Sequence, residues 1–70
     1  MHVTALVHAA RLRGVIQTRR PRGLFLAHEG KVWVAVDNST GHAWTEEFSS
    51  PQEAVRWLGQ ARRNNLRFWN

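Results

Sequence analysis

Arginines are the side chains whose type and spacing in this sequence point most directly to chemistry. Arg19, Arg20 and Arg22 lie close together between Thr18 and Gly23, in a segment that Pro21 prevents from continuing as a helix. Arginine presents a planar fork of donors that matches the oxygens of phosphate and carboxylate groups. The segment is therefore either a solvated linker or a phosphate clamp, and we favour the clamp.

The charge of the whole chain agrees with a polyanionic partner. Its 70 residues include ten Lys and Arg against five Asp and Glu, a formal net charge of +5, and nine of the ten cations are Arg. The sequence pI is about 11.7. Residues 1–36 carry 6 − 1 = +5, residues 37–53 carry −4, and residues 54–70 carry +4. Basic ends thus flank an acidic middle, which favours nucleic acid or an acidic protein as partner.

The remaining polar residues form no catalytic or metal-binding pattern. His28 and His42 are expected at opposite ends of one strand, too far apart to share a metal ion. Glu46 and Glu47 are neighbours on a predicted strand and therefore point to opposite faces, so they do not form an acid–base pair. The four histidines, none with metal-ligand spacing, are His2, His8, His28 and His42.

The size of the chain also argues against an enzyme. No glycine-rich loop that could cradle a phosphate leads into a helix. Seventy residues leave little room for an enclosed substrate pocket of ordinary volume. We therefore expect no catalytic residue, no metal, no cofactor and no small-molecule substrate.

Length and composition predict one small domain, residues 1–70, without disulfides. There is no cysteine, so the core must rely on aliphatic residues together with four Trp and three Phe. No apolar run reaches the roughly 20 residues that cross a bilayer, and the first residues do not form a secretory leader. We expect no membrane association and a cytoplasmic location, in a bacterium or phage-infected cell.

The stretch from residue 30 to residue 58 predicts a hairpin followed by a helix. Residues 31–37 alternate, with valine at every even position, and residues 42–48 alternate again after the turn formers of 38–41. Ser50-Pro51-Gln52-Glu53 has the spacing of a capping box with proline at the first helical position. The helix is expected to run from Pro51 to about Arg63, before Asn64-Asn65, with the aromatic tail either folded back as a lid or free for a partner.

The segment before this stretch supplies one more strand and an ambiguous first element. Residues 24–28 are a short apolar run, joined to the next strand by a tight turn at Glu29-Gly30. In residues 4–13 the alanines favour a helix that Gly14 ends, but β-branched residues leave a strand within 3–18 possible. The expected fold is α+β: a three-stranded antiparallel meander packed on a C-terminal helix, with an N-terminal helix (αβββα).

The two faces of this sheet are expected to differ. One, which would receive the C-terminal helix, carries Leu24, Leu26, Val32, Val34, Val36, Trp44 and Phe48. The other carries Phe25, Ala27, Lys31, Trp33, Ala35, Ala43, Thr45 and Glu47, with Phe25 and Trp33 as cross-strand neighbours. An apolar patch of this kind is covered by the N-terminal helix, covered by a second copy of the chain, or used to contact a partner.

The hairpin-to-helix stretch also resembles known DNA-binding domains. The resemblance rests on these residues: Gly30, Lys31, Trp33, the turn at 38–41, Trp44, Phe48, Ser49, Ser50, Glu53, Ala54, Trp57 and Leu58. It is to the amino-terminal arm-binding domains of tyrosine recombinases and to the plant apetala-type domains, both three-stranded sheets backed by a helix. The resemblance implies that the exposed sheet face enters the major groove, with Lys31, Trp33 and Thr45 facing DNA. An order of helix, three strands and helix would also resemble the double-stranded-RNA-binding domain.

Two functions are consistent with the sequence. The first is a small non-enzymatic nucleic-acid-binding accessory protein of a phage or mobile element, with DNA favoured. It would contact phosphates through Arg19, Arg20 and Arg22, with Lys31, Trp33 and Thr45 on the sheet. The alternative is a protein-interaction or homodimerisation module that uses a face containing Phe25, Trp33 and Glu47.

Overall fold

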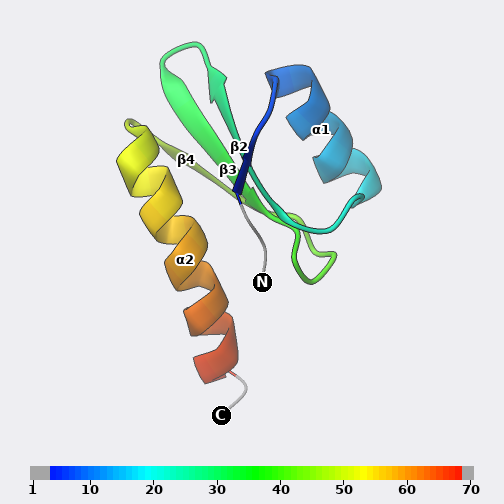
Figure 1. The fold of residues 1–70 in the computed structure, drawn as a ribbon, viewed down its shortest axis with the longest axis vertical. Helices are drawn as coiled ribbons and strands as arrows, with labels where there is room; N and C mark the ends of the chain where they lie inside the picture. Colours follow the sequence, from blue (N-terminus) through cyan, green and yellow to red (C-terminus); the bar gives the residue numbers. More distant parts are fainter. Residues whose placement is uncertain (1–3, 69–70) are drawn as a thin grey trace.

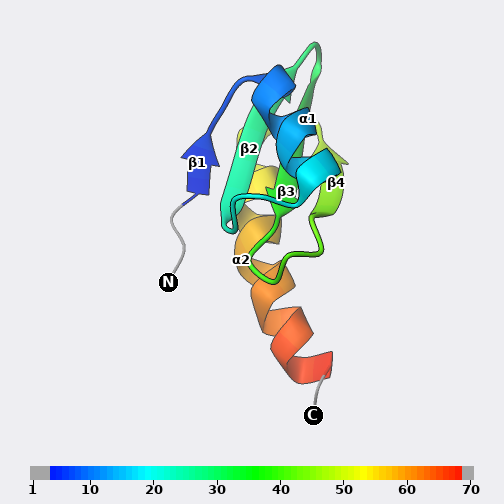
Figure 2. The same ribbon diagram turned by 90° about the vertical axis from the view of Figure 1, so that its right-hand side faces the viewer.

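The part of the chain that the structure describes forms a four-stranded mixed sheet with one helix on each face (Figures 1 and 2). The computed structural model describes the backbone from residue 4 to residue 68 and side chains from residue 4 to residue 59. The elements follow in the order β1 (Thr4–Leu6), α1 (Ala9–Thr18), β2 (Leu24–Glu29), β3 (Val32–Asp37), β4 (Trp44–Phe48) and α2 (Pro51–Phe68). The strands are adjacent in the same order, β1-β2-β3-β4.

The predicted α+β class is confirmed, but the predicted sheet is only partly right. Strands β2, β3 and β4 form the expected antiparallel meander. A fourth strand, β1, lies beside β2 and runs parallel to it, with Thr4 opposite Leu24. The sheet therefore has four strands and one parallel pair instead of three antiparallel strands.

The ambiguous first segment contains both a strand and a helix. Residues 4–6 form β1, and α1 begins at Ala9 rather than at Thr4. A parallel pair needs a crossover between its strands, and α1 supplies it. Gly14 does not end this helix. The helix ends at Thr18, and the next residue, Arg19, adopts a left-handed conformation (φ 57°) and donates its backbone N–H to the Val15 carbonyl at 2.7 Å.

The face that carries the β3 valines packs against α1. In the β2–β3 register Phe25 lies opposite Val36 and Ala27 opposite Val34, so these four residues share one face. Together with α1 they form a core cluster of Leu12, Val15, Phe25, Ala27, Val34 and Val36. The prediction that the valines receive the C-terminal helix is therefore wrong.

The opposite face packs against α2. Its buried cluster consists of Leu24, Leu26, Ala35, Ala54 and Leu58, with Trp33, Phe48 and Trp57 packed at its margin. Trp33 is thus half-buried beside α2, whereas Phe25 is 5% exposed on the α1 side. The predicted face that joined Phe25 to Trp33 does not exist, because the two side chains lie on opposite sides of the sheet.

Helix α2 begins as predicted and ends later than predicted. The Ser50 hydroxyl accepts the Glu53 backbone N–H at 3.3 Å, and the Glu53 carboxylate accepts the hydroxyls of Ser50 and Ser49 at 3.0 and 3.1 Å. The helix then continues through Asn64-Asn65 to Phe68. The predicted lid of terminal aromatic residues falls outside the described side chains. No helix in the described part of the chain is both long enough and apolar enough to span a bilayer.

Candidate nucleic-acid interface

Three exposed arginines lie on the loop that joins α1 to β2. This arginine loop, residues 19–23, carries Arg19, Arg20 and Arg22, and all three side chains are exposed. Its start is fixed by the left-handed residue that ends α1. The Thr18 hydroxyl oxygen accepts the backbone N–H of Arg20 at 3.3 Å, which holds the next residue close to the helix end. The sequence thus predicted correctly that these arginines share one exposed connector.

Asn38 ties the arginine loop to the turn between β3 and β4. Its side chain is fully buried. The Asn38 Nδ2 donates to the Pro21 carbonyl at 2.8 Å, and its Oδ1 accepts the backbone N–H of Ala43 at 3.0 Å. Its backbone exchanges hydrogen bonds with Gly23, at 2.7 and 3.3 Å. One side chain therefore fixes two loops that are far apart in sequence, a role that its position among turn formers did not reveal.

Arg22 rests against the second of these loops. A Cβ built on Gly41 would lie 3.3 Å from Nη2 of Arg22, so the guanidinium packs directly over the glycine. Gly41 has a φ of +87°, which favours a residue without a side chain. The turn therefore allows close approach of the arginine and helps to orient it.

The turn itself is closed by a buried carboxylate. Asp37 is fully buried, and its Oδ1 accepts the backbone N–H of Ser39 at 3.0 Å and its hydroxyl at 2.6 Å. Its Oδ2 makes no hydrogen bond with any described residue. Hydrogen bonds from an aspartate to the residue two positions later are typical of a turn.

The positive charge of the arginine loop is not neutralised by the described side chains. Within residues 4–59 one ion pair forms, between Arg13 and Glu29 at 2.9 Å, and both partners are largely exposed. Arg19, Arg20 and Arg22 take no part in it. No described side chain therefore competes with an external anion for their guanidinium groups.

The other residues predicted to contact nucleic acid do not gather with the arginines. Lys31 lies in the turn between β2 and β3, at the opposite end of the sheet (Figure 1). Trp33 belongs to the α2 side, whereas Thr45 lies opposite Val36 and so belongs to the α1 side. Glu47 lies opposite Val34 and shares the side of Thr45. The single sheet face that was expected to present these residues is absent.

An exposed tryptophan lies at the same end of the sheet as the arginine loop. Trp44, the first residue of β4, is 53% exposed, and its ring centroid is 6.0 Å from that of His42. His42 follows Gly41, on which Arg22 packs. The sequence placed Trp44 in the core beside Phe48. The structure corrects this, because α2 packs against Phe48 and leaves Trp44 uncovered.

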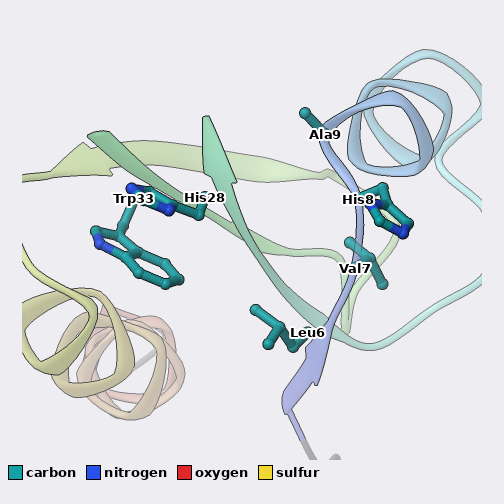
Figure 3. Close-up of a pocket in the computed structure, with 6 residues that line it drawn as sticks. All are labelled: Leu6, Val7, His8, Ala9, His28 and Trp33. Carbon is teal, nitrogen blue, oxygen red and sulfur yellow. The ribbon is translucent and has the colours of Figure 1, made fainter. Parts of the chain in front are cut away.

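A pocket of about 350 Å³ lies at the other end of the sheet (Figure 3). His28 stacks on Trp33, with ring centroids 4.2 Å apart and planes 8° from parallel, and Leu6 lies across the opening. The residues that line it are Leu6, Val7, His8, Ala9, His28 and Trp33. No group of three or more potential metal ligands occurs among the described residues.

Comparison with known proteins gives no match, whether with protein-family models, curated sequences or solved structures.

Proposed function

We propose that this protein binds the phosphate backbone of nucleic acid, with DNA favoured, through the arginine loop. The observation that carries the proposal is that Arg19, Arg20 and Arg22 are exposed, have no ion-pair partner among the described side chains, and project from a loop that is anchored by Asn38. An anchored loop loses less conformational freedom on binding than a flexible linker does. Anchoring thus favours the phosphate clamp over the solvated linker.

The rest of the chain's charge agrees with a polyanionic partner. The last turns of α2 run past the end of the sheet (Figure 1). The sequence has Arg62, Arg63 and Arg67 in this part, and the net charge of the chain is +5. An excess of positive charge favours a polyanion.

The contact is assigned to the loops rather than to the sheet. The resemblance to sheet-based DNA-binding domains implied an open sheet face, but α1 covers one face of this sheet and α2 the other (Figure 2). A phosphate-binding loop needs no free sheet face. The alternative of a protein-interaction or dimer surface on Phe25, Trp33 and Glu47 is not retained, because Phe25 and Trp33 lie on opposite faces.

The test compares two triple variants with equal net charge. Arg19, Arg20 and Arg22 are changed to glutamine in one, and Arg11, Arg13 and Arg56 in the other, so each has a net charge of +5 − 3 = +2. Fluorescence anisotropy with a labelled DNA duplex is recorded over a salt series. Loss of three phosphate contacts should lower the slope of log affinity against log salt by about 2.7 and the affinity at 0.1 M salt by roughly 10²- to 10³-fold.

The control triple should lose much less affinity, because its three arginines lie outside the loop. Equal losses in the two variants would show that net charge alone governs binding and would refute the proposed site. Absence of binding by the unmodified protein to DNA and RNA at low salt would refute the function itself. Matching circular dichroism spectra and unfolding midpoints ensure that both variants are folded.

A further inference from the structure

Trp44 is an exposed aromatic residue that neither core cluster uses. It is 53% exposed at the start of β4, on the edge of the sheet. At the far end of the same strand, Phe48 packs against Trp57 of α2, with ring centroids 5.8 Å apart. The two aromatic residues of β4 therefore have different surroundings: one completes the core under α2, and the other is left in solvent beside His42.

The surroundings of Trp44 are basic on one side and acidic on the other. Towards the arginine loop, His42 and Gly41 lead directly to the guanidinium of Arg22. In the other direction along β4, the exposed Glu46 lies two residues away and so shares a face with Trp44. A phosphate chain would be attracted by Arg22 and repelled by Glu46. It would therefore reach Trp44 from the arginine loop and would not continue along the strand.

From this arrangement we infer that Trp44 is a stacking platform for an unpaired base, and that the preferred ligand is single-stranded nucleic acid. The inference rests on the proposed function, since the arginine loop must hold the adjoining phosphates. A base in a duplex already stacks on its neighbours and is not available to an external ring. A base in a single strand can stack on Trp44 without first leaving a duplex. Any of the bases can do so, because every base has an aromatic face.

The experiment measures affinities for a labelled single strand and for a duplex of the same length. Trp44→Ala should weaken binding of the single strand roughly 5- to 150-fold, the range for loss of one stacked base. Its affinity for the duplex should change less than about twofold, because phosphate contacts alone hold the duplex. Trp44→Phe should retain most of the single-strand affinity, since phenylalanine keeps a ring for stacking. Leu6→Ala is the matched control. Leu6 is also exposed (72%), but it lines the pocket at the opposite end of the sheet from Trp44.

Failure of this inference can be told apart from failure of the proposed function. If Trp44→Ala leaves single-strand affinity unchanged, or lowers single-strand and duplex affinity equally, Trp44 is no base platform. The arginine-loop variants then still report on the phosphate contact by themselves. If instead the variant with Arg19, Arg20 and Arg22 changed to glutamine binds both ligands as tightly as the unmodified protein, the proposed function fails. The stacking site then fails with it. The fluorescence emission of Trp44 is obtained as the difference between the spectra of the unmodified protein and of Trp44→Phe. If this emission does not change when saturating single strand is added, the inference is also overturned.

Discussion

Replacing Asn38 with alanine should destabilise the protein and weaken its binding to nucleic acid, although Asn38 itself is buried. The substitution removes the donor to the Pro21 carbonyl and the acceptor of the Ala43 N–H. A buried polar group that loses its partner costs about 1–3 kcal/mol. The Pro21 carbonyl belongs to an exposed residue and can recover part of this from water. We therefore expect a loss of about 2–4 kcal/mol in the free energy of unfolding.

This loss is large for so small a domain. At about 0.05–0.15 kcal/mol per residue, 70 residues give a total stability of about 4–10 kcal/mol. Urea denaturation followed by circular dichroism measures the change, which should appear as a lower midpoint with an unchanged slope. Under conditions where the variant is still folded, its DNA affinity should also fall, since the arginine loop is no longer held. A change of less than about 0.5 kcal/mol, the size of an ordinary surface substitution, would refute the anchoring role of Asn38.

Asn38→Asp makes the hydrogen bond to the Pro21 carbonyl depend on pH, whereas the bond from the Ala43 N–H can form at any pH. When protonated, the new carboxyl can still donate to the Pro21 carbonyl and accept from Ala43, as the amide does. When ionised, it has no proton to donate and carries a buried charge beside the buried Asp37. Burial therefore raises the pKa of the new carboxyl in the folded protein above its unfolded value. Its contribution to stability is present at low pH and is lost as pH rises through the folded pKa, so the gap to the unmodified protein should widen in that direction.

Four further substitutions test the fold and the site. Ser50→Ala should lower the free energy of unfolding by about 1 kcal/mol through loss of the helix cap, measured by urea denaturation; an unchanged midpoint would contradict the capping assignment. Leu58→Ala should lower it by about 2–5 kcal/mol, because the side chain is 1% exposed in the α2 cluster, and a loss below 1 kcal/mol would contradict its burial. Gly41→Ala and Gly30→Ala should each cost about 1–2 kcal/mol for a side chain at positive φ. Only Gly41→Ala should also reduce DNA affinity, since the new methyl group displaces the Arg22 guanidinium; equal affinities of the two variants would show that the position of Arg22 is unimportant.

The features that could be predicted from sequence are those that depend on neighbouring residues. The meander and the start of α2 follow from turn formers, alternation and the capping box, all of which act over a few positions. The three-residue strand β1 could not be identified, because its pairing with β2 depends on a crossover and not on its own short sequence. The end of α2 was also missed, since Asn64-Asn65 only weakly disfavours a helix.

The hairpin turn between β2 and β3 determines which residues of these strands share a face of the sheet. A two-residue turn pairs the residues on either side of it, and paired residues point to the same face. In the structure Glu29 pairs with Val32 across Gly30 and Lys31. Odd-numbered residues of β2 must then share a face with the even-numbered valines of β3. Shifting the turn by one residue gives the same parity, so the turn already excluded a face with both Phe25 and Trp33.

The charges of the candidate site could be predicted from sequence, but the contacts that hold its loops in place could not. The spacing of Arg19, Arg20 and Arg22 was enough to identify an exposed basic connector. That Asn38 anchors this connector depends on a contact between loops 17 residues apart, the bond from Asn38 to Pro21. No local pattern reports such a contact. The position of Trp44 in a strand suggested burial, and only the placement of α2 over Phe48 leaves it exposed.

The parallel pairing of β1 also imposes an order on assembly. Thr4 pairs with Leu24, 24 − 4 = 20 positions later. At a synthesis rate of about 5–20 residues per second, β1 waits roughly 1–4 s before its partner has been made. The β2–β3 hairpin needs only a two-residue turn and closes within about 1–10 μs of its completion. The strand of this sheet that is translated first therefore stays unpaired until β2 has been made.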